Sequence, residues 1–183
     1  MLSTKGRICV VDEKFVSEKP TKFQIENLNK FFKINNNILD SCGKVLYHCE
    51  KNKFYDRDNN VLFEYELKKG LSTSKLNIII NSKASSTTVI IKNRFAFNFE
   101  LIFYNEALKK ETTLKLKGHV FKNSYEIMNE DSSSLLCSFK RNGLLNPSYS
   151  VEMTKGLDTV FMLILIIATT NIIQRNQAIA ASS

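Results

Sequence analysis

The chain has 183 residues, enough for one domain that buries roughly two thirds of the surface its unfolded form would expose. Hydrophobic residues make up 43% and charged residues 24%, a profile that excludes collagen-like and broadly disordered proteins. The net charge of +8 favours binding to anionic surfaces, and both phospholipid headgroups and nucleic acids present such surfaces. Because the lysines are scattered with no run of five, a merely solubilising surface is the alternative interpretation.

The N-terminal residues MLSTKGRICV contain no apolar run typical of a secretory signal. We therefore expect a cytoplasmic protein, with peripheral membrane attachment as an option. Its four cysteines, Cys9, Cys42, Cys49 and Cys137, should then be reduced. Cys42 and Cys49 flank His48, but no second ligand pair follows at zinc spacing. We expect no metal and no cofactor.

Alternating apolar and polar residues, the pattern of half-buried strands, recur along the chain. Residues 22–32 could form an amphipathic helix, although the residues that follow favour a strand. The alternation is clearest at 61–67 and recurs at 89–103, 135–139 and 149–153. The second of these runs is too long for one typical strand, which predicts a bend or turn around Lys92 to Arg94.

Three Asx-rich turns lie between apolar strands, at 38–47, 54–65 and 127–139. Asp and Asn side chains bond nearby backbone amides and tolerate left-handed conformations, so each turn predicts a hairpin. A calcium site is the rival interpretation, but the ligand order of an EF-hand is missing from all three. Loops are expected at 35–37, 68–75 and 82–86.

The C-terminal run TVFMLILIIATTNII is apolar on every side, which allows either a membrane span or a helix enclosed by protein. Asp158 is placed to cap its start, and Gln174 with Arg175 are expected to close it. About fifteen residues rise only about 22 Å, less than the hydrocarbon core of about 30 Å. We therefore predict a buried core helix whose packing residues include Phe161, Leu163, Ile164, Leu165, Ile166 and Ile167.

The predicted strands and the predicted apolar helix are compatible with a single fold. An antiparallel sheet of many short strands avoids open edges by closing into a barrel, and an apolar helix can fill such a barrel. The sequence thus predicts a mainly β protein: a closed antiparallel β-barrel around a buried hydrophobic C-terminal helix.

An ordered series of segments resembles the LURP-one-related family, which is grouped with tubby C-terminal domains and phospholipid scramblases. The series is VVDEKFVSEKPTKFQI, ILDSCGKVLYHCEK, FYDRDNNVLFEYELKK, LKLKGHVFKNSYEIMNEDSSSLLCSFKR and YSVEMTKGLDTVFMLILIIATTNI. The resemblance implies a tubby C-terminal-like barrel of about twelve strands. It covers a single domain at 10–176, which leaves 1–9 and 177–183 as flexible ends.

The same resemblance bears on function. Tubby domains bind phosphoinositides through basic residues, and scramblases are membrane-associated and calcium-responsive. This chain lacks a recognisable acidic calcium loop and a following membrane span, which disfavours lipid transport. The implied function is a non-enzymatic binding or adaptor module for anionic membrane lipid, such as phosphoinositide, or for a protein partner. A nucleic-acid-associated basic protein is the alternative.

Candidate ligand-binding residues follow from strand spacing, because residues two apart on a strand share a face. Two basic pairs meet this rule, Lys92 with Arg94 and Lys115 with Lys117, and Lys109 with Lys110 lies in the turn before the second pair. Each pair could contact one phosphate group. The two histidines, His48 and His119, have no nucleophile motif beside them, so the sequence predicts no enzyme.

Overall fold

The computed structural model of the protein describes residues 7–27, 35–95, 97–119, 122–131, 133–143 and 148–182. Within these residues twelve antiparallel strands form one closed barrel. Short 3-10 helices η1 (Glu13–Phe15) and η2 (Asn81–Lys83) and one long helix, α1 (Thr159–Ala181), complete the fold. The strands are β1 (Thr21–Asn27), β2 (Asn36–Leu39), β3 (Val45–Glu50), β4 (Lys53–Asp56), β5 (Val61–Lys68), β6 (Thr73–Ile80), β7 (Ser85–Phe95), β8 (Asn98–Asn105), β9 (Lys110–His119), β10 (Ser124–Asn129), β11 (Leu135–Asn142) and β12 (Ser148–Met153).

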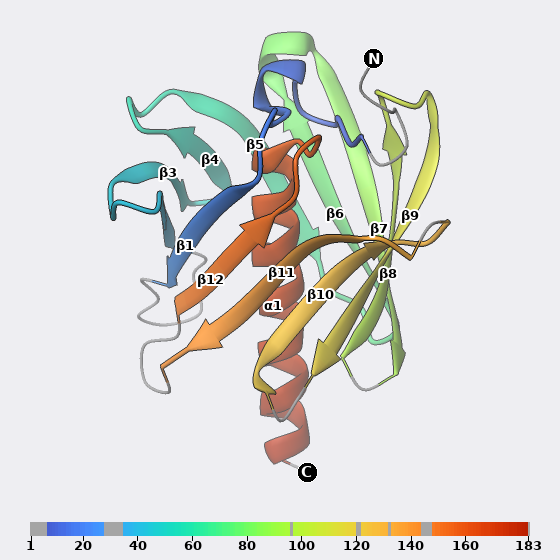
Figure 1. The fold of residues 1–183 in the computed structure, drawn as a ribbon. Coiled ribbons are helices and arrows are strands. Elements are labelled where there is room, and N and C mark those ends of the chain that lie inside the picture. Colours follow the sequence, from blue (N-terminus) through green and yellow to red (C-terminus); the bar gives the residue numbers. More distant parts are fainter. Residues whose placement is uncertain are drawn as a thin grey trace.

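Barrel closure joins the first strand to both the second and the last. In register, β1 aligns Thr21 with Met153 of β12 and Gln24 with Leu39 of β2. Every other strand pairs with its sequence neighbours, so the wall is a meander (Figure 1). Pairing every strand on both sides removes the open edges that invite aggregation. The predicted closed antiparallel barrel is confirmed. Of the segment 22–32, for which a helix was the alternative, residues 22–27 belong to strand β1 and the remainder lies outside the described residues.

The three predicted hairpins are confirmed, and each begins with an Asx side chain that bonds its own turn. Asp40 accepts hydrogen bonds from the backbone N–H groups of Cys42 and Lys44 at 2.8 and 3.0 Å. Asp56 does the same at the β4–β5 turn, and Asn129 accepts from the Asp131 N–H at the β10–β11 turn. Local side-chain chemistry therefore fixes where the chain reverses.

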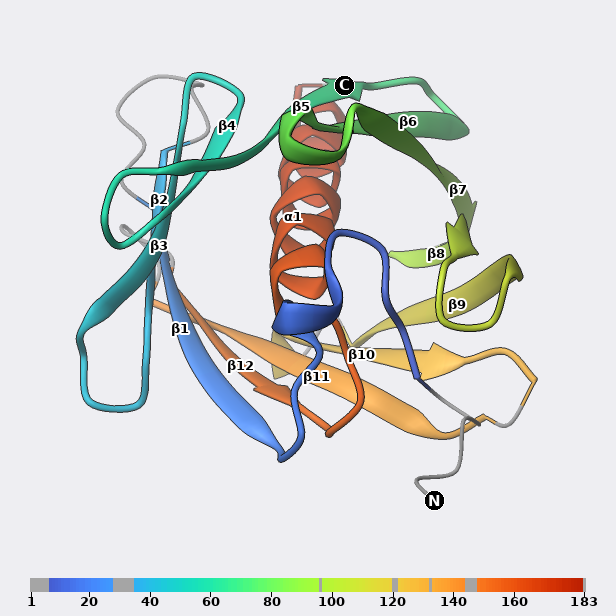
Figure 2. The ribbon, with the colours of Figure 1, turned by 90° about the horizontal axis from the view of Figure 1, so that it is seen from above.

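The barrel is filled by α1, which the wall surrounds in the view from above (Figure 2). The predicted core residues of the helix are all buried, and Phe161, Leu163 and Ile166 have no exposed surface. The wall contributes inward-facing side chains such as Phe103, whose ring centroid lies 4.8 Å from that of Phe161. Burial on every face of the helix explains why the sequence shows no polar stripe between Thr159 and Ala168.

The end of the helix is a correction to the sequence prediction. The helix does not stop at Gln174 and Arg175 but continues to Ala181, so it occupies most of the segment 177–183 that was expected to be a flexible tail. Residues 176–181 contain neither Gly nor Pro, and their alanines and glutamine are good helix formers.

The length argument against a membrane span was therefore wrong. With 23 residues, α1 is long and apolar enough to cross a membrane by length and composition alone. What makes it a core helix is burial, because 78% of its most apolar window lies inside the protein.

Several loop predictions also need correction. Residues 36 and 37 belong to β2, and the loop expected at 68–75 shortens to 69–72 because β6 begins at Thr73. Strand β7 runs through Lys92–Arg94 to Phe95, with a register shift between Asn93 and Phe95 and the reversal just after it. These positions carry polar side chains, some of them buried, such as Asn36 and Ser74, and backbone pairing within the wall does not depend on apolar side chains.

Candidate functional site

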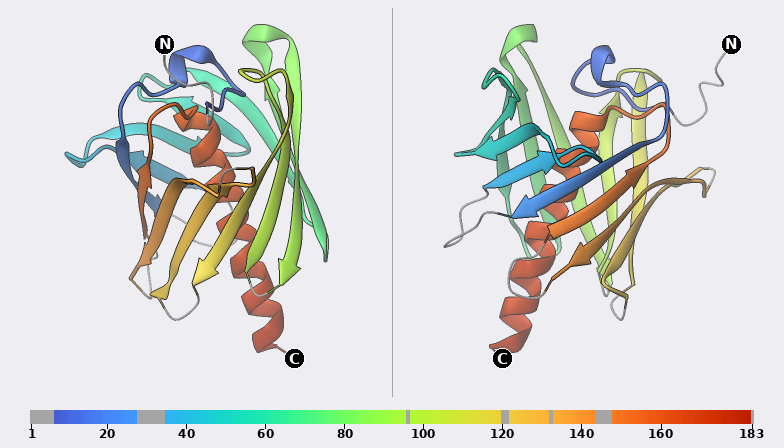
Figure 3. Two further views of the ribbon diagram at one scale, coloured as in Figure 1. Left: turned by 45° about the vertical axis from the view of Figure 1, so that its right-hand side comes forward. Right: turned by 60° about the vertical axis from the view of Figure 1, so that its left-hand side comes forward.

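The two ends of the barrel differ in what they hold. At the capped end, the N-terminal residues and η1 cover the start of α1, and the β2–β3, β4–β5 and β8–β9 turns lie around it. At the exit end, α1 leaves the barrel among the β5–β6, β7–β8 and β9–β10 connections and projects beyond them (Figures 1 and 3). A hydrogen bond of 2.6 Å from Lys69 Nζ to Asn171 Oδ1 joins the β5–β6 loop to the departing helix.

The predicted basic pairs do share the outer face of the wall, but acids lie between them. Lys92 on β7 aligns with Glu100 on β8, which aligns with Lys115 on β9. Arg94 forms an ion pair with Glu100 and lowers the pKa of that carboxyl group through a hydrogen bond. Lys115 pairs with Glu130 at 3.1 Å. These contacts neutralise much of the charge that the pairs would present to a ligand.

Lys109 and Lys110 lie at the capped end, away from the exit-end halves of β7 and β9. Lys109 Nζ is 2.7 Å from a carboxylate oxygen of Glu106, and Lys110 Nζ is 3.7 Å from one of Asp131. The structure therefore brings Lys92, Arg94 and Lys117 toward one end of the barrel and places Lys109 and Lys110 at the other.

Basic side chains concentrate at the exit end beyond those that strand spacing indicated. Most acids at or near this end are paired: Glu50 with Lys51, Glu64 with Lys53, Glu66 with Lys68, Glu100 with Arg94 and Glu126 with His119. Glu26, at the end of β1, accepts a hydrogen bond from Gln24. The segments outside the described ranges contain no Asp or Glu. In the described residues, the following exit-end cations form no ion pair: Lys69, Lys75, Lys92, Lys117, Lys122, Lys140, Arg141 and Arg175.

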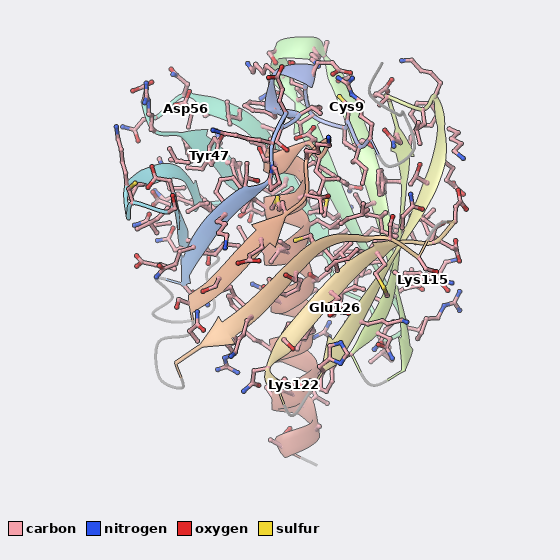
Figure 4. All side chains as sticks on the ribbon, in the orientation of Figure 1. Cys9, Tyr47, Asp56, Lys115, Lys122 and Glu126 are labelled. Atoms are coloured by element: carbon pink, nitrogen blue, oxygen red, sulfur yellow. The ribbon has the colours of Figure 1, made fainter. Side chains whose placement is uncertain are left out.

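The sequence held a signal for this arrangement that strand spacing alone does not use. In a meander, every second connection lies at the same end of the sheet. The sequences of the exit-end connections contain no Asp or Glu, whereas those of the capped end include Asp40, Asp58 and Glu106. In Figure 4, Lys122 lies toward the exit end, whereas Cys9, Tyr47 and Asp56 lie toward the capped end.

An apolar side chain projects from this basic surface. Leu71, in the β5–β6 loop, is 89% exposed, and Ile179 on the projecting part of α1 is 46% exposed. The loop is tight: a Cβ atom on Gly70 would lie 2.1 Å from the carbonyl oxygen of Thr73. A hydrogen bond of 3.1 Å from the Gly70 N–H to Ser74 Oγ also holds it. Leu71 is thus presented outward by a well-bonded loop.

Comparison with known proteins decides the family. The sequence profile of the LURP-one-related family matches residues 4–170. The chain belongs to the LURP-one-related family. The X-ray structure of an Arabidopsis thaliana protein is similar, with a TM-score of 0.64 and 17% identity over 90% of this chain and 98% of that chain, which shows a shared fold. No curated protein matches this sequence significantly.

LURP-one-related membership and the tubby-like barrel suggest a non-enzymatic binding module. The histidines fit this interpretation. His119 lies 3.5 Å from Glu126 on the outer wall, and His48 stacks on Tyr55 with ring centroids 4.5 Å apart. A hollow of about 320 Å³ at the capped end is lined by Phe15, Leu46, Tyr47 and Leu62, with Lys14, Asp56, Arg57 and Asp58 beside them, and neither histidine reaches it.

The cysteines of this LURP-one-related protein are free thiols. Cys9, Cys49 and Cys137 are buried, and only Cys42 is exposed. Burial raises the pKa of the Cys9 thiol to about 12, with the nearby carboxylates of Asp158 and Glu13 adding to the effect. In the part of the chain that the structure describes, no three His, Cys, Asp or Glu side chains are grouped so as to hold a metal ion.

Proposed function

We propose that this LURP-one-related protein is a non-enzymatic module that docks on anionic membrane surfaces with the exit end of its barrel. The observation that supports this is the gathering of cations without acidic partners at the same end of the barrel as an exposed leucine, Leu71. Docking of this kind makes the protein a peripheral membrane protein at a cytoplasmic membrane face, because that leaflet carries the anionic lipids.

Electrostatic attraction supplies the first part of the binding energy. A Lys or Arg held near an anionic membrane surface contributes about 1 kcal/mol, and the attraction falls off within a Debye length of about 8 Å at physiological salt. The exit end presents several such side chains, including Lys92 on β7, Lys117 on β9 and Lys122 in the β9–β10 connection. Binding should therefore be strong at low salt and weaken steeply as salt is added.

Apolar contact supplies the second part and sets the orientation. Burying a leucine side chain fully contributes about 1.5–3 kcal/mol, and Leu71 is almost fully exposed in solution. The loop places it directly after Lys68, Lys69 and Gly70. A leucine beside two lysines suits the boundary between headgroups and acyl chains, where both side chains find favourable surroundings.

Nucleic acid fits this surface less well. Proteins that bind single strands without sequence preference stack bases on exposed aromatic rings. Among the described residues, the large exposed aromatic side chain is Tyr104, which lies toward the capped end of β8. Among the described residues, the large apolar side chains exposed at the exit end, Leu71 and Ile179, are aliphatic, which favours a membrane over a nucleic acid.

Vesicle co-sedimentation tests the proposal. Wild-type protein is mixed with phosphatidylcholine vesicles, with or without phosphatidylserine, at low and physiological salt. Lys117→Gln combined with Lys122→Gln should weaken binding to anionic vesicles about 30-fold, because each lysine contributes about 1 kcal/mol. The matched control, Lys19→Gln with Lys44→Gln, removes two exposed lysines of the capped end and should change binding less than about threefold.

Leu71→Ser should weaken binding at high salt as much as at low salt, because it removes apolar contact and no charge. The proposal fails if wild-type protein does not bind anionic vesicles at low salt, or if the two double variants behave alike. Tight, salt-dependent binding to RNA or DNA without vesicle binding would identify the alternative, a nucleic-acid-associated protein.

A further inference from the structure

Two cations at the mouth of the barrel, Lys69 and Arg175, are near enough to interact: besides burial, the charge of Arg175 lowers the pKa of Lys69. Lys69 donates from Nζ to Asn171 Oδ1 at 2.6 Å. Asn171 and Arg175 are one turn apart on α1, so their side chains lie on the same face of the helix. The Lys69 ammonium group is therefore held on the face of the helix that carries the Arg175 guanidinium group.

No acid in the described residues balances this pair. Glu66, on strand β5 just before Lys69, instead forms an ion pair with Lys68, with 3.2 Å between its carboxylate oxygen and Lys68 Nζ. Lys75 aligns directly with Lys68 across β5 and β6, and like charges opposite each other destabilise a sheet. The surroundings of Lys69 thus add positive charge, and the carboxamide of Asn171 accepts one hydrogen bond without offsetting it.

Without a ligand, keeping Lys69 charged beside Arg175 is electrostatically unfavourable. Partial burial of the ammonium group lowers the pKa of Lys69, and the charge of Arg175 lowers it further. Such a cost is easily avoided at a surface position, since a change at either residue would relieve it. Binding sites for anions are places where a cost of this kind is offset by the ligand.

We propose that Lys69 and Arg175 bind a phosphate monoester between them, with Asn171 positioning the lysine. This inference rests on the proposed membrane docking, because it names the headgroup that the exit end selects: a phosphoinositide. An ammonium group has three donors, so two remain after the bond to Asn171, and the guanidinium fork can bond two phosphate oxygens at once.

Charge matching explains the choice of a monoester. A phosphate monoester carries about −1.5 to −2 charges at pH 7, which is enough to balance both cations. A phosphodiester carries one negative charge and would balance one of them. Leu71 follows Lys69 by two residues, so insertion of the leucine brings the pair to the level of the headgroups. A soluble inositol phosphate has the same chemistry, and the experiment separates the two sources.

The experiment compares vesicles that contain phosphatidylinositol 4,5-bisphosphate with phosphatidylserine vesicles of equal surface charge, and titrates inositol 1,4,5-trisphosphate by calorimetry. Wild-type protein should prefer the phosphoinositide vesicles about tenfold, since charge-assisted bonds to the headgroup are added to the general attraction. Lys69→Gln and Arg175→Gln should each abolish that preference. Arg175→Lys should keep part of it, because the charge remains and the fork is lost.

Two matched controls, Lys75→Gln and Lys140→Gln, remove a charge at the same end. They should weaken binding to both kinds of vesicle equally and leave the preference intact. The melting temperature supplies a folding control: Arg175→Gln should not lower it, because the substitution removes repulsion with Lys69. A variant that both loses the preference and keeps its stability has lost a ligand contact.

The results separate the two proposals. A wild-type protein that binds both vesicles equally, or a preference that survives in Lys69→Gln and Arg175→Gln, overturns the phosphate site and leaves membrane docking standing. If no vesicle is bound but inositol trisphosphate binds and is lost in both variants, membrane docking fails and the site is one for a soluble phosphate. Absence of all binding overturns both.

Discussion

The buried carboxylate of Asp158 offers the sharpest test of how the barrel is sealed. Its Oδ1 accepts a hydrogen bond of 3.0 Å from the Phe161 N–H, which caps the helix. Its Oδ2 accepts from the N–H groups of Val10, Val11 and Asp12 at 3.1, 2.7 and 3.3 Å. One side chain thus starts α1 and fastens residues 8–12, the N-terminal strap, across the capped end.

Asp158→Ala removes both functions. Loss of a helix cap costs about 0.5–2 kcal/mol, and buried N–H groups that lose a charged acceptor cost about 1.5 kcal/mol or more each. Counting the cap and the two shorter strap bonds gives a free energy of unfolding lower by about 4 kcal/mol, or a Tm lower by roughly 10 °C for a chain of this size. Asp158→Ser keeps an oxygen for the Phe161 N–H but cannot reach the strap, so we expect a loss of about 3 kcal/mol.

Urea denaturation measures the total, and hydrogen exchange at Val10 and Val11 measures the strap alone. Both variants should expose these amides, and should also let Cys9, a buried residue of the strap, react with a thiol reagent. Asp56→Ser, in an exposed turn, is the control and should leave Cys9 protected. Loss of less than 1 kcal/mol in Asp158→Ala, with unchanged exchange at Val10 and Val11, would refute the reasoning.

Three further predictions concern the core, the thiols and pH. Ile166→Asp should unfold the domain by burying a charge among apolar side chains, whereas Ile166→Val should cost about 0.5–1.5 kcal/mol in a urea titration. Mass spectrometry after alkylation at pH 8 should find Cys42 modified alone in the native protein, and a Cys42→Ser variant unmodified until denatured. The Lys14 N–H bond lowers the pKa of Asp12 below its ordinary value near 3.8. The stability that this carboxylate contributes is therefore complete above pH 3.8 and is lost as the pH falls through the lower pKa of the folded state. In an acid titration of the free energy of unfolding, Asp12→Asn should lack this loss.

The barrel could be predicted because its signals are local. Alternation places Phe63 and Tyr65 on the inner face, and both are buried. Asp40 and Asp56 set their own turns by bonding backbone amides. A helix without a polar face must be enclosed on all sides, and a closed sheet is the enclosure that the strands can form.

The sequence predictions were wrong where the conformation depends on a neighbouring strand or on contact with solvent. Leu135 was expected to face inward, yet it is 48% exposed while Leu136 is buried, because the partner strand β10 shifts register between Ile127 and Met128. Alternation within one strand does not reveal a bulge in its pairing. The end of α1 was misplaced for a related reason: polar residues after Ile173 mark where the helix leaves the barrel, and the backbone stays helical in solvent.

The candidate site was harder to predict than the fold. Spacing correctly placed Lys115 and Lys117 on one outer face, but the acids that oppose such residues come from other strands. Glu100 and Glu130 reach Arg94 and Lys115 only through the register of β7 to β10. The exit-end surface depends on the same long-range information, since it joins loops that are far apart in sequence. Topology had to be known before the charges could be assigned to an end.

The position of helix α1 also determines which part of the molecule could contact a membrane. Withdrawing α1 would expose both its own apolar surface and the inner wall, so the segment that most resembles a membrane span is the one least able to act as one. The capped end is fastened by Asp158 and carries the acids of its turns, including Asp40, Asp56 and Asp58. In the proposed docking, contact with an anionic surface is therefore left to the exit end, where several described cations, such as Lys69 and Lys117, form no ion pair and Leu71 projects. A helix enclosed at one end and free at the other thus gives the barrel two chemically different ends.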